Sequence, residues 1–349
     1  MIAILGHPTR AKLTKKPVAG SVVRLVIRPV AWLVRTVAAA ALVLTVMAFG
    51  QTAGAEKLTI VTTIAQLADA AHAIAGERAD VTSLMGEGVD PHNYQLTRTD
   101  VRRLATADIV FWNGLFLEAQ LEDFLVDLST TKPVIALGET LDPARLLSPE
   151  GFAGHYDPHI WMDPRLWSEI VVSLRKILAK ADPDGAKIYQ KNAEAYLDVL
   201  RKIDAYSETA LSTVPAEKRV MISAHDAFNY FGRRYNFEVI GIQGLSTASE
   251  AGLLAVENLV DLIVERKIQS VFAESSVSTR NVRALIEGAA ARGQTTRVGG
   301  QLYSDAMGAP TTYEGTYLGM LDHNVTTITR ALGGTAPQLG FGSKLRAGG

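Results

Sequence analysis

Two runs of alternating β-rich and helical segments constrain the fold of this chain more than any other feature. The first run has β-rich segments at residues 57–63, 80–85, 108–112 and 133–137, and helical patterns at 64–77, 97–107 and 166–181. The second run has β-rich segments at residues 219–223, 237–243, 270–273 and 296–298, and helical patterns at 250–266, 279–292 and 312–332. Repeated βα units predict an α/β fold with two parallel-sheet lobes and right-handed crossovers.

A single long helical pattern separates the two runs. It begins with Pro183 in its first turn and extends to about Leu211. At 1.5 Å per residue, about 29 residues would extend roughly 43 Å, enough to pass along both lobes. We expect an N-terminal lobe at residues 56–182, a connector helix at 183–213 and a C-terminal lobe at 214–340. A rigid connector predicts small lobe movements and a largely preformed cleft.

The first 55 residues have the character of an export signal. They contain seven Lys or Arg and no acid, and their apolar core of 13 residues at 37–49 is short for a bilayer span. Ala53-Gly54-Ala55 supplies a small-x-small cleavage pattern, so we expect the mature chain to begin at Glu56. A permanent membrane anchor is the alternative. The sequence contains no cysteine, which predicts neither a disulfide nor a lipid attachment and favours a bacterial periplasm.

The mature chain is acidic. Residues 56–349 keep 28 of the 35 basic residues and all 36 acidic ones. Nucleic acid is therefore not an expected partner, because its recognition depends on a basic surface.

Four loops, each bounded by Pro or Gly or following a strand, carry side chains that can bind a metal. These side chains are His92, His159, His225 and Asp305. Carboxyl ends of parallel strands are the usual ligand position in such folds, so two donors from each lobe would meet in the cleft between the lobes. Three imidazoles and one carboxylate form a shell that suits Zn²⁺, and that Mn²⁺ or Fe²⁺ could also use if the carboxylate is bidentate.

Neighbouring carboxylates are candidates to orient these donors. The loop around His159 has two Asp-Pro turns, and we expect Asp163 to lie behind the imidazole. Glu274 ends a strand directed at the cleft, either behind a donor or as an alternative carboxylate ligand. Taken alone, each Pro-His pair could be a turn with a solvated imidazole, and Asp226 beside His225 could simply cap a helix.

The loops and strands together resemble the metal-binding solute-binding proteins of zinc and manganese ABC transporters. The resemblance covers most of residues 56–332 and rests on segments 90–94, 107–118, 157–164, 224–231, 272–276 and 303–306. It implies two α/β lobes, a connecting helix, a cleft metal site and delivery to a membrane permease powered by a cytoplasmic ATPase. The family's ligand pattern maps onto His92, His159, His225 and Asp305.

The resemblance leaves the choice of metal between zinc and manganese or iron. Many manganese-type members carry Glu where this chain has His225, so three histidines favour zinc. Many zinc-type members carry a His-rich loop, and residues 118–154 contain no histidine. Such a site holds Zn²⁺ more tightly than Mn²⁺ whatever its cargo.

Other functional classes remain as alternatives. A periplasmic zinc hydrolase would keep one metal position open for water, and this chain has no His-Glu-x-x-His helix. A surface adhesin or structural zinc protein is a third class. We expect no catalytic residues and no resident cofactor besides the metal, and a monomer that works with the permease and, in some systems, a periplasmic metallochaperone.

Overall fold

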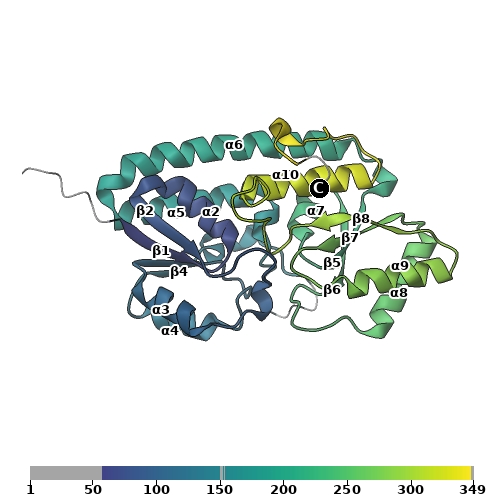
Figure 1. Cartoon of the computed structure of the whole chain (residues 1–349), viewed down its shortest axis with the longest axis horizontal. Coiled ribbons are helices and arrows are strands. Elements are labelled where there is room, and N and C mark those ends of the chain that lie inside the picture. The colour runs from purple at the N-terminus through teal and green to yellow at the C-terminus, as the bar shows by residue number, and fades with distance from the viewer. Residues whose placement is uncertain (1–56, 150–151, 153, 347–349) are drawn as a thin grey trace, which may run out of the picture. The chain divides into compact units, whose positions relative to one another are not determined.

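The computed structural model of the chain describes residues 57–149, 152 and 154–346. The predicted export signal, its cleavage point and Glu56 lie outside the described residues. The first half contains one parallel four-stranded sheet of order β2-β1-β3-β4 (Figure 1). Its strands are β1 (Leu58–Thr62), β2 (Ala79–Ser83), β3 (Ile109–Trp112) and β4 (Val134–Ala136). The helices of this half are α2 (Ala65–Ala75), α3 (Arg98–Thr106), α4 (Glu122–Ser129) and α5 (Pro164–Ala181).

The second half builds two parallel strand pairs. One pair joins β5 (Val220–His225) to β6 (Glu238–Gln243), and the other joins β7 (Ser270–Glu274) to β8 (Arg297–Leu302). β5 lies beside β7, so the two pairs form one layer. The helices of this half are α7 (Asn229–Tyr235), α8 (Leu253–Glu265), α9 (Arg280–Ala291) and α10 (Tyr317–Ala331).

Helix α6 (Ala186–Ser212) connects the halves as one uninterrupted helix of 27 residues. At 1.5 Å per residue it is about 40 Å long. It packs against α2 and α5 of the first half and against α7 and α10 of the second (Figure 1). The expected architecture of two parallel-sheet lobes joined by one long helix is therefore confirmed, while the exact lobe boundaries remain a prediction.

A continuous apolar core extends under the loops that carry the predicted donors. Strand β3 is buried along its whole length, as a strand covered on both faces should be. Trp167 of α5 stacks on Tyr317 of α10 with ring centroids 5.0 Å apart, and the Tyr317 hydroxyl donates to the carbonyl of Trp161 at 2.8 Å. These contacts join the first half directly to α10. They also fix the backbone of the loop before α5, which carries His159.

Several element boundaries differ from the sequence prediction for local reasons. α10 begins at Tyr317 because the Thr316 hydroxyl accepts from the Gly319 amide and caps the helix there. α4 and α7 were not predicted. Both are short, with 8 and 7 residues, and neither has a side-chain N-cap. Short helices of this kind display too little of the 3.6-residue period to be recognised.

Candidate metal centre

The first two predicted donors lie in matching turns at the edge of the first sheet. His92 follows β2, and the Asp90 carboxylate two residues earlier accepts from its backbone amide at 2.9 Å. His159 precedes α5, and Asp157 accepts from its amide at the same distance, 2.9 Å. The Asp-Pro-His sequence thus forms the same turn twice, because the Asp side chain bonds the backbone two residues on and Pro fixes the intervening φ.

The other two predicted donors come from the second half. His225 is the last residue of β5, and Asp305 follows the end of β8. The Gln66 side chain of α2 donates to the Asp305 carbonyl at 2.9 Å, and the Trp161 indole donates to the Ser304 carbonyl, also at 2.9 Å. Residues of the first half therefore fix the backbone of the loop that carries Asp305.

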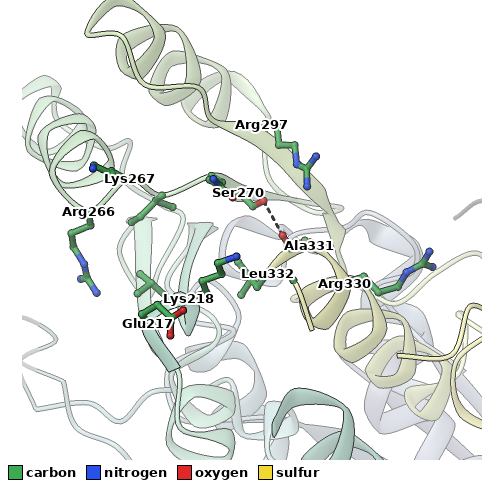
Figure 2. A pocket seen from close by; sticks show the side chains of 13 residues that line it. Glu217, Lys218, Arg266, Lys267, Ser270, Arg297, Arg330, Ala331 and Leu332 are labelled. Carbon is green, nitrogen blue, oxygen red and sulfur yellow. Dashed lines mark hydrogen bonds between the residues drawn. The ribbon is translucent and has the colours of Figure 1, made fainter. Parts of the chain in front are cut away.

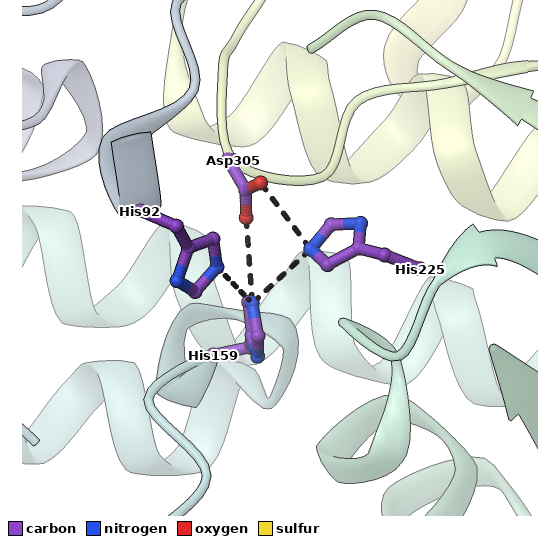
Figure 3. A group of neighbouring side chains, drawn as sticks. All are labelled: His92, His159, His225 and Asp305. Atoms are coloured by element: carbon purple, nitrogen blue, oxygen red, sulfur yellow. Dashed lines mark hydrogen bonds and ion pairs between the residues drawn. The ribbon is translucent and has the colours of Figure 1, made fainter. Parts of the chain in front are cut away.

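All four predicted donors converge, and all four are buried (Figure 3). Their donor atoms lie within 4.8 Å of one another. The Nε2 atom of His159 is 3.4 Å from Nε2 of His92 and 3.3 Å from Nε2 of His225. The Asp305 carboxylate faces the same point, with Oδ1 3.4 Å from His159 Nε2 and Oδ2 3.2 Å from His225 Nε2.

The four separations that involve His159 Nε2 or Asp305, 3.2 to 3.4 Å, fit the edges of a tetrahedron around a metal ion. Bonds of 2.0–2.1 Å in tetrahedral geometry place neighbouring donors about 3.3 Å apart. The two Asp305 oxygens also face different imidazoles, so the carboxylate can bind through one oxygen or through both. The arrangement therefore accommodates four donor atoms for zinc, or five for an ion that prefers more ligands.

Two buried carboxylates fix the tautomers of two imidazoles. Asp157 Oδ1 lies 2.8 Å from Nδ1 of His159, and Glu274 Oε2 lies 2.5 Å from Nδ1 of His225. A proton held on Nδ1 leaves Nε2 with a free lone pair. Glu274 Oε1 also accepts from the backbone amide of His225 at 2.9 Å, so this carboxylate orients both ring and backbone.

Neighbouring lone pairs cannot satisfy one another, which creates a demand for positive charge at the centre. The Asp305 atom Oδ1 is buried and accepts no hydrogen bond within the described part of the chain. A buried carboxylate oxygen without a donor is costly unless a cation or a proton compensates for it. The site thus meets the chemical requirement for binding a metal cation.

The pKa values of the three imidazoles also show that the carboxylates favour positive charge at the centre. Burial lowers the pKa of His159, but the Asp157 and Asp305 carboxylates outweigh burial and raise it to about 9. Burial also opposes the protonation of His225, yet Asp305 and Glu274 raise its pKa well above its ordinary value. For His92 burial dominates and lowers the pKa to about 3, so this imidazole is neutral.

The two carboxylates predicted to lie behind the donors have different positions. Glu274 bonds His225, as described above. Asp163 instead accepts from the Arg165 amide at 2.9 Å and caps the start of α5. Asp157 is the carboxylate that contacts the His159 ring. The signal that could have identified it is the Asp two residues before His, which recurs at Asp90.

Comparison with known proteins agrees with this geometry. Residues 60–331 match the family model described as zinc-uptake complex component A, periplasmic. This chain belongs to that family. It is 45% identical over 277 residues to the manganese-binding lipoprotein MntA of Bacillus subtilis, an alignment that covers 79% of this chain and 90% of MntA.

A second relative has also been solved as a structure. The zinc-binding protein TroA of Treponema pallidum is 43% identical over 276 residues, covering 79% of this chain and 89% of TroA. The solved TroA structure superposes with a TM-score of 0.77 and covers 79% of this chain and 99% of that one. The family consists of solute-binding proteins of ABC metal transporters, which work with a permease and an ATPase.

Proposed function

We propose that this protein captures a divalent transition metal in the periplasm and delivers it to an ABC-transporter permease, with zinc as the first candidate cargo. The observation that carries the proposal is the buried cluster of three Nε2 atoms facing a carboxylate oxygen that accepts no hydrogen bond from any residue the structure describes. His92, His159, His225 and Asp305 are the proposed ligands. The proposal includes no catalytic role, because four protein ligands leave a tetrahedral ion no open position for water.

Zinc is favoured over manganese by the donor set rather than by the relatives. The names of two similar relatives specify manganese for one and zinc for the other, at 45% and 43% identity. Three imidazole donors suit zinc. The Irving-Williams order does not contribute to this choice, because it favours Zn²⁺ over Mn²⁺ at any such site whatever the cargo. Manganese or iron is the alternative cargo, and the two available oxygens of Asp305 would serve their larger coordination number.

Release is proposed to follow from the two-plus-two division of the ligands. His92 and His159 precede α6 in the chain, whereas His225 and Asp305 follow it. We propose lobes at residues 56–182 and 214–340 with the connector at 183–213, so that docking on a permease separates the two pairs. Hydrogen exchange of the loops at His92 and Asp305 should slow when metal is bound. Equal exchange with and without metal would contradict this mechanism.

The proposed location is the periplasm, after removal of residues 1–55 and without a lipid anchor. The absence of cysteine from the sequence supports the latter point. The MntA relative is named a lipoprotein, so this chain would differ from it. Among the described helices, none is both long and apolar enough to cross a bilayer. Sequencing the N-terminus of the exported protein should give Glu56, and a lipid-modified terminus would contradict the proposal.

We further propose that the protein is a monomer, with loading by a metallochaperone as an additional route.

The decisive experiment measures metal content of the untagged protein after a challenge with equimolar Zn²⁺ and Mn²⁺. We expect one tightly bound ion, predominantly Zn²⁺, and its loss in His225→Ala. His72→Ala is the matched control, because His72 is exposed on α2 away from the donors. Retention of the ion by His225→Ala would overturn the ligand assignment.

A further inference from the structure

A second pocket opens in the C-terminal half at the amino ends of its strands. It has a volume of about 280 Å³. Figure 2 shows the side chains that line it. His225 and Asp305 lie at or after the carboxyl ends of strands in the same layer, so the pocket lies at the opposite edge of that layer. Four separate segments meet here: the start of β5, the turn from α8 to β7, the start of β8 and the end of α10.

The lining of this pocket is strongly cationic. Five basic side chains and one acid contribute to it, namely Lys218, Arg266, Lys267, Arg297, Arg330 and Glu217. Arg266 already donates hydrogen bonds from its two terminal guanidinium nitrogens to the Glu238 carboxylate, at 2.7 Å each. The other four cations form no ion pair within the described residues. In a chain with an excess of acids, this concentration of positive charge is a local exception.

The floor of the pocket is apolar and needs no ligand for itself. Val220, Ile268 and Leu332 are each less than a tenth exposed. The Ser270 hydroxyl at the base donates to the Ala331 carbonyl at 3.1 Å, so it is already satisfied (Figure 2). Recognition of a ligand would therefore come from the cations of the rim, while the floor would contact an uncharged part of the same molecule.

Helix dipoles explain some of these cations but not all of them. Arg266, Lys267 and Arg330 lie at the carboxyl ends of α8 and α10, where positive charge is favourable. Lys218 precedes β5 in the chain, but its ammonium lies beside Gly333 at the carboxyl end of α10, so it also benefits from a helix end. Arg297 is the first residue of β8 and belongs to no helix. Lys267 has φ of 52°, at a position after a helix where glycine is the usual residue. The chain thus holds a lysine in a conformation that lysine rarely adopts.

We propose that this pocket binds a phosphate-bearing anion. A phosphate group presents several acceptor oxygens, which suits ammonium and guanidinium donors that approach from different elements. The volume admits the phosphate together with a small organic group, near the lower limit for ligand sites. A soluble phosphate ester and the headgroup of an anionic lipid share this chemistry.

The test uses the full mature protein with its metal bound, titrated with inorganic phosphate, with glycerol phosphate, and with vesicles of pure phosphatidylglycerol or pure phosphatidylcholine. The variant Lys218→Gln/Arg297→Gln removes two of the four lining cations that form no ion pair within the described residues. The control Lys191→Gln/Arg283→Gln removes the same charges from the exposed surfaces of α6 and α9.

We expect the pocket variant to weaken binding at least tenfold and the control to leave it unchanged. Binding of the soluble phosphates identifies a free ligand, and binding of phosphatidylglycerol vesicles alone identifies a headgroup. Equal binding by both variants, or no binding of any phosphate probe, would overturn the proposal. Metal affinity should be equal in the variant and the control, which separates this proposal from the capture function.

Discussion

Thr247 and Asp90 are joined by a hydrogen bond of 2.5 Å between the two halves of the protein, with the threonine hydroxyl as donor. Asp90 holds the turn of His92 in the first half, and Thr247 belongs to the loop between β6 and α8 in the second. Asn93 adds to this link, because its amide donates to the Thr247 hydroxyl at 3.0 Å. One side chain of the second half is thus bound to Asp90, two residues before His92, and to Asn93, directly after it.

Breaking this link should accelerate metal release. A hydrogen bond to a charged group contributes about 1.5–3 kcal/mol, so Thr247→Val should raise the dissociation rate roughly tenfold or more. Stopped-flow exchange with a chelator measures this rate. Thr209→Val is the control, because Thr209 is exposed on α6 and bonds only the Ala205 carbonyl. Equal rates in the two variants would exclude a retaining role for Thr247.

Exchanging the carboxylate behind His225 should weaken metal binding without unfolding the protein. Glu274→Gln replaces one acceptor oxygen by an amide donor, which cannot serve both the ring and the backbone of His225. Substituting a residue that hydrogen-bonds to a metal ligand typically reduces the affinity for the metal 10- to 100-fold. Competition with a chelator of known affinity provides the measurement.

Asp163→Asn is the matched control for that substitution. Asp163 caps α5, and asparagine caps helices equally well. We expect the affinity of this variant to equal that of the unmodified protein. A loss as large as that of Glu274→Gln would assign Asp163 a direct influence on the donors.

Metal affinity should fall as pH falls, because binding displaces protons. The pKa of His159 is raised to about 9, and that of His225 is raised well above its ordinary value. Both rings therefore carry a second proton at neutral pH before a metal binds. His92, with its pKa of about 3, is neutral and has no additional proton to release. Below pH 9 the proton displaced from His159 reduces affinity about tenfold per pH unit, and the proton displaced from His225 adds to this dependence.

Isothermal titration calorimetry in buffers of different ionisation enthalpy counts the protons released. We expect about two per ion at pH 7, and fewer as the pH rises past 9. An affinity that stays constant between pH 7.5 and 5 would contradict the three-imidazole site.

Added metal should raise thermal stability, because only the folded chain presents all four donors together. At a free metal concentration 100 times the Kd, the folded state gains about 2.7 kcal/mol. For a chain of this size each kcal/mol raises Tm by about 2–4 °C, so the expected shift is roughly 5–10 °C. Differential scanning calorimetry with and without EDTA measures it. A shift of the same size in His225→Ala would place the stabilising ion elsewhere.

The sequence predicted which four metal-capable side chains lie together better than it predicted the carboxylates behind them, and their role as ligands stays a prediction. His92, His159, His225 and Asp305 were identifiable because each is a metal-capable side chain in a loop at or after the end of a strand. Which carboxylate supports His159 was not identifiable, because Asp157-Pro158 and Asp163-Pro164 have the same local sequence. One forms the turn of the histidine and the other starts a helix, a difference decided by packing. The hydrogen bond between Thr247 and Asp90 joins residues 157 positions apart, so no local sequence pattern predicts it.

The carboxyl-edge placement of the donors determines the order of folding and loading. The donors reach one another only after β2, β5, β8 and the loop before α5 have been assembled, and joining His92 to Asp305 closes a loop that includes most of the mature chain. The entropy of closing that loop must be met by the apolar core before the ion can contribute. The ion therefore does not direct the folding of the nascent chain. The protein should reach its native topology without any metal and should then be able to bind the ion at once.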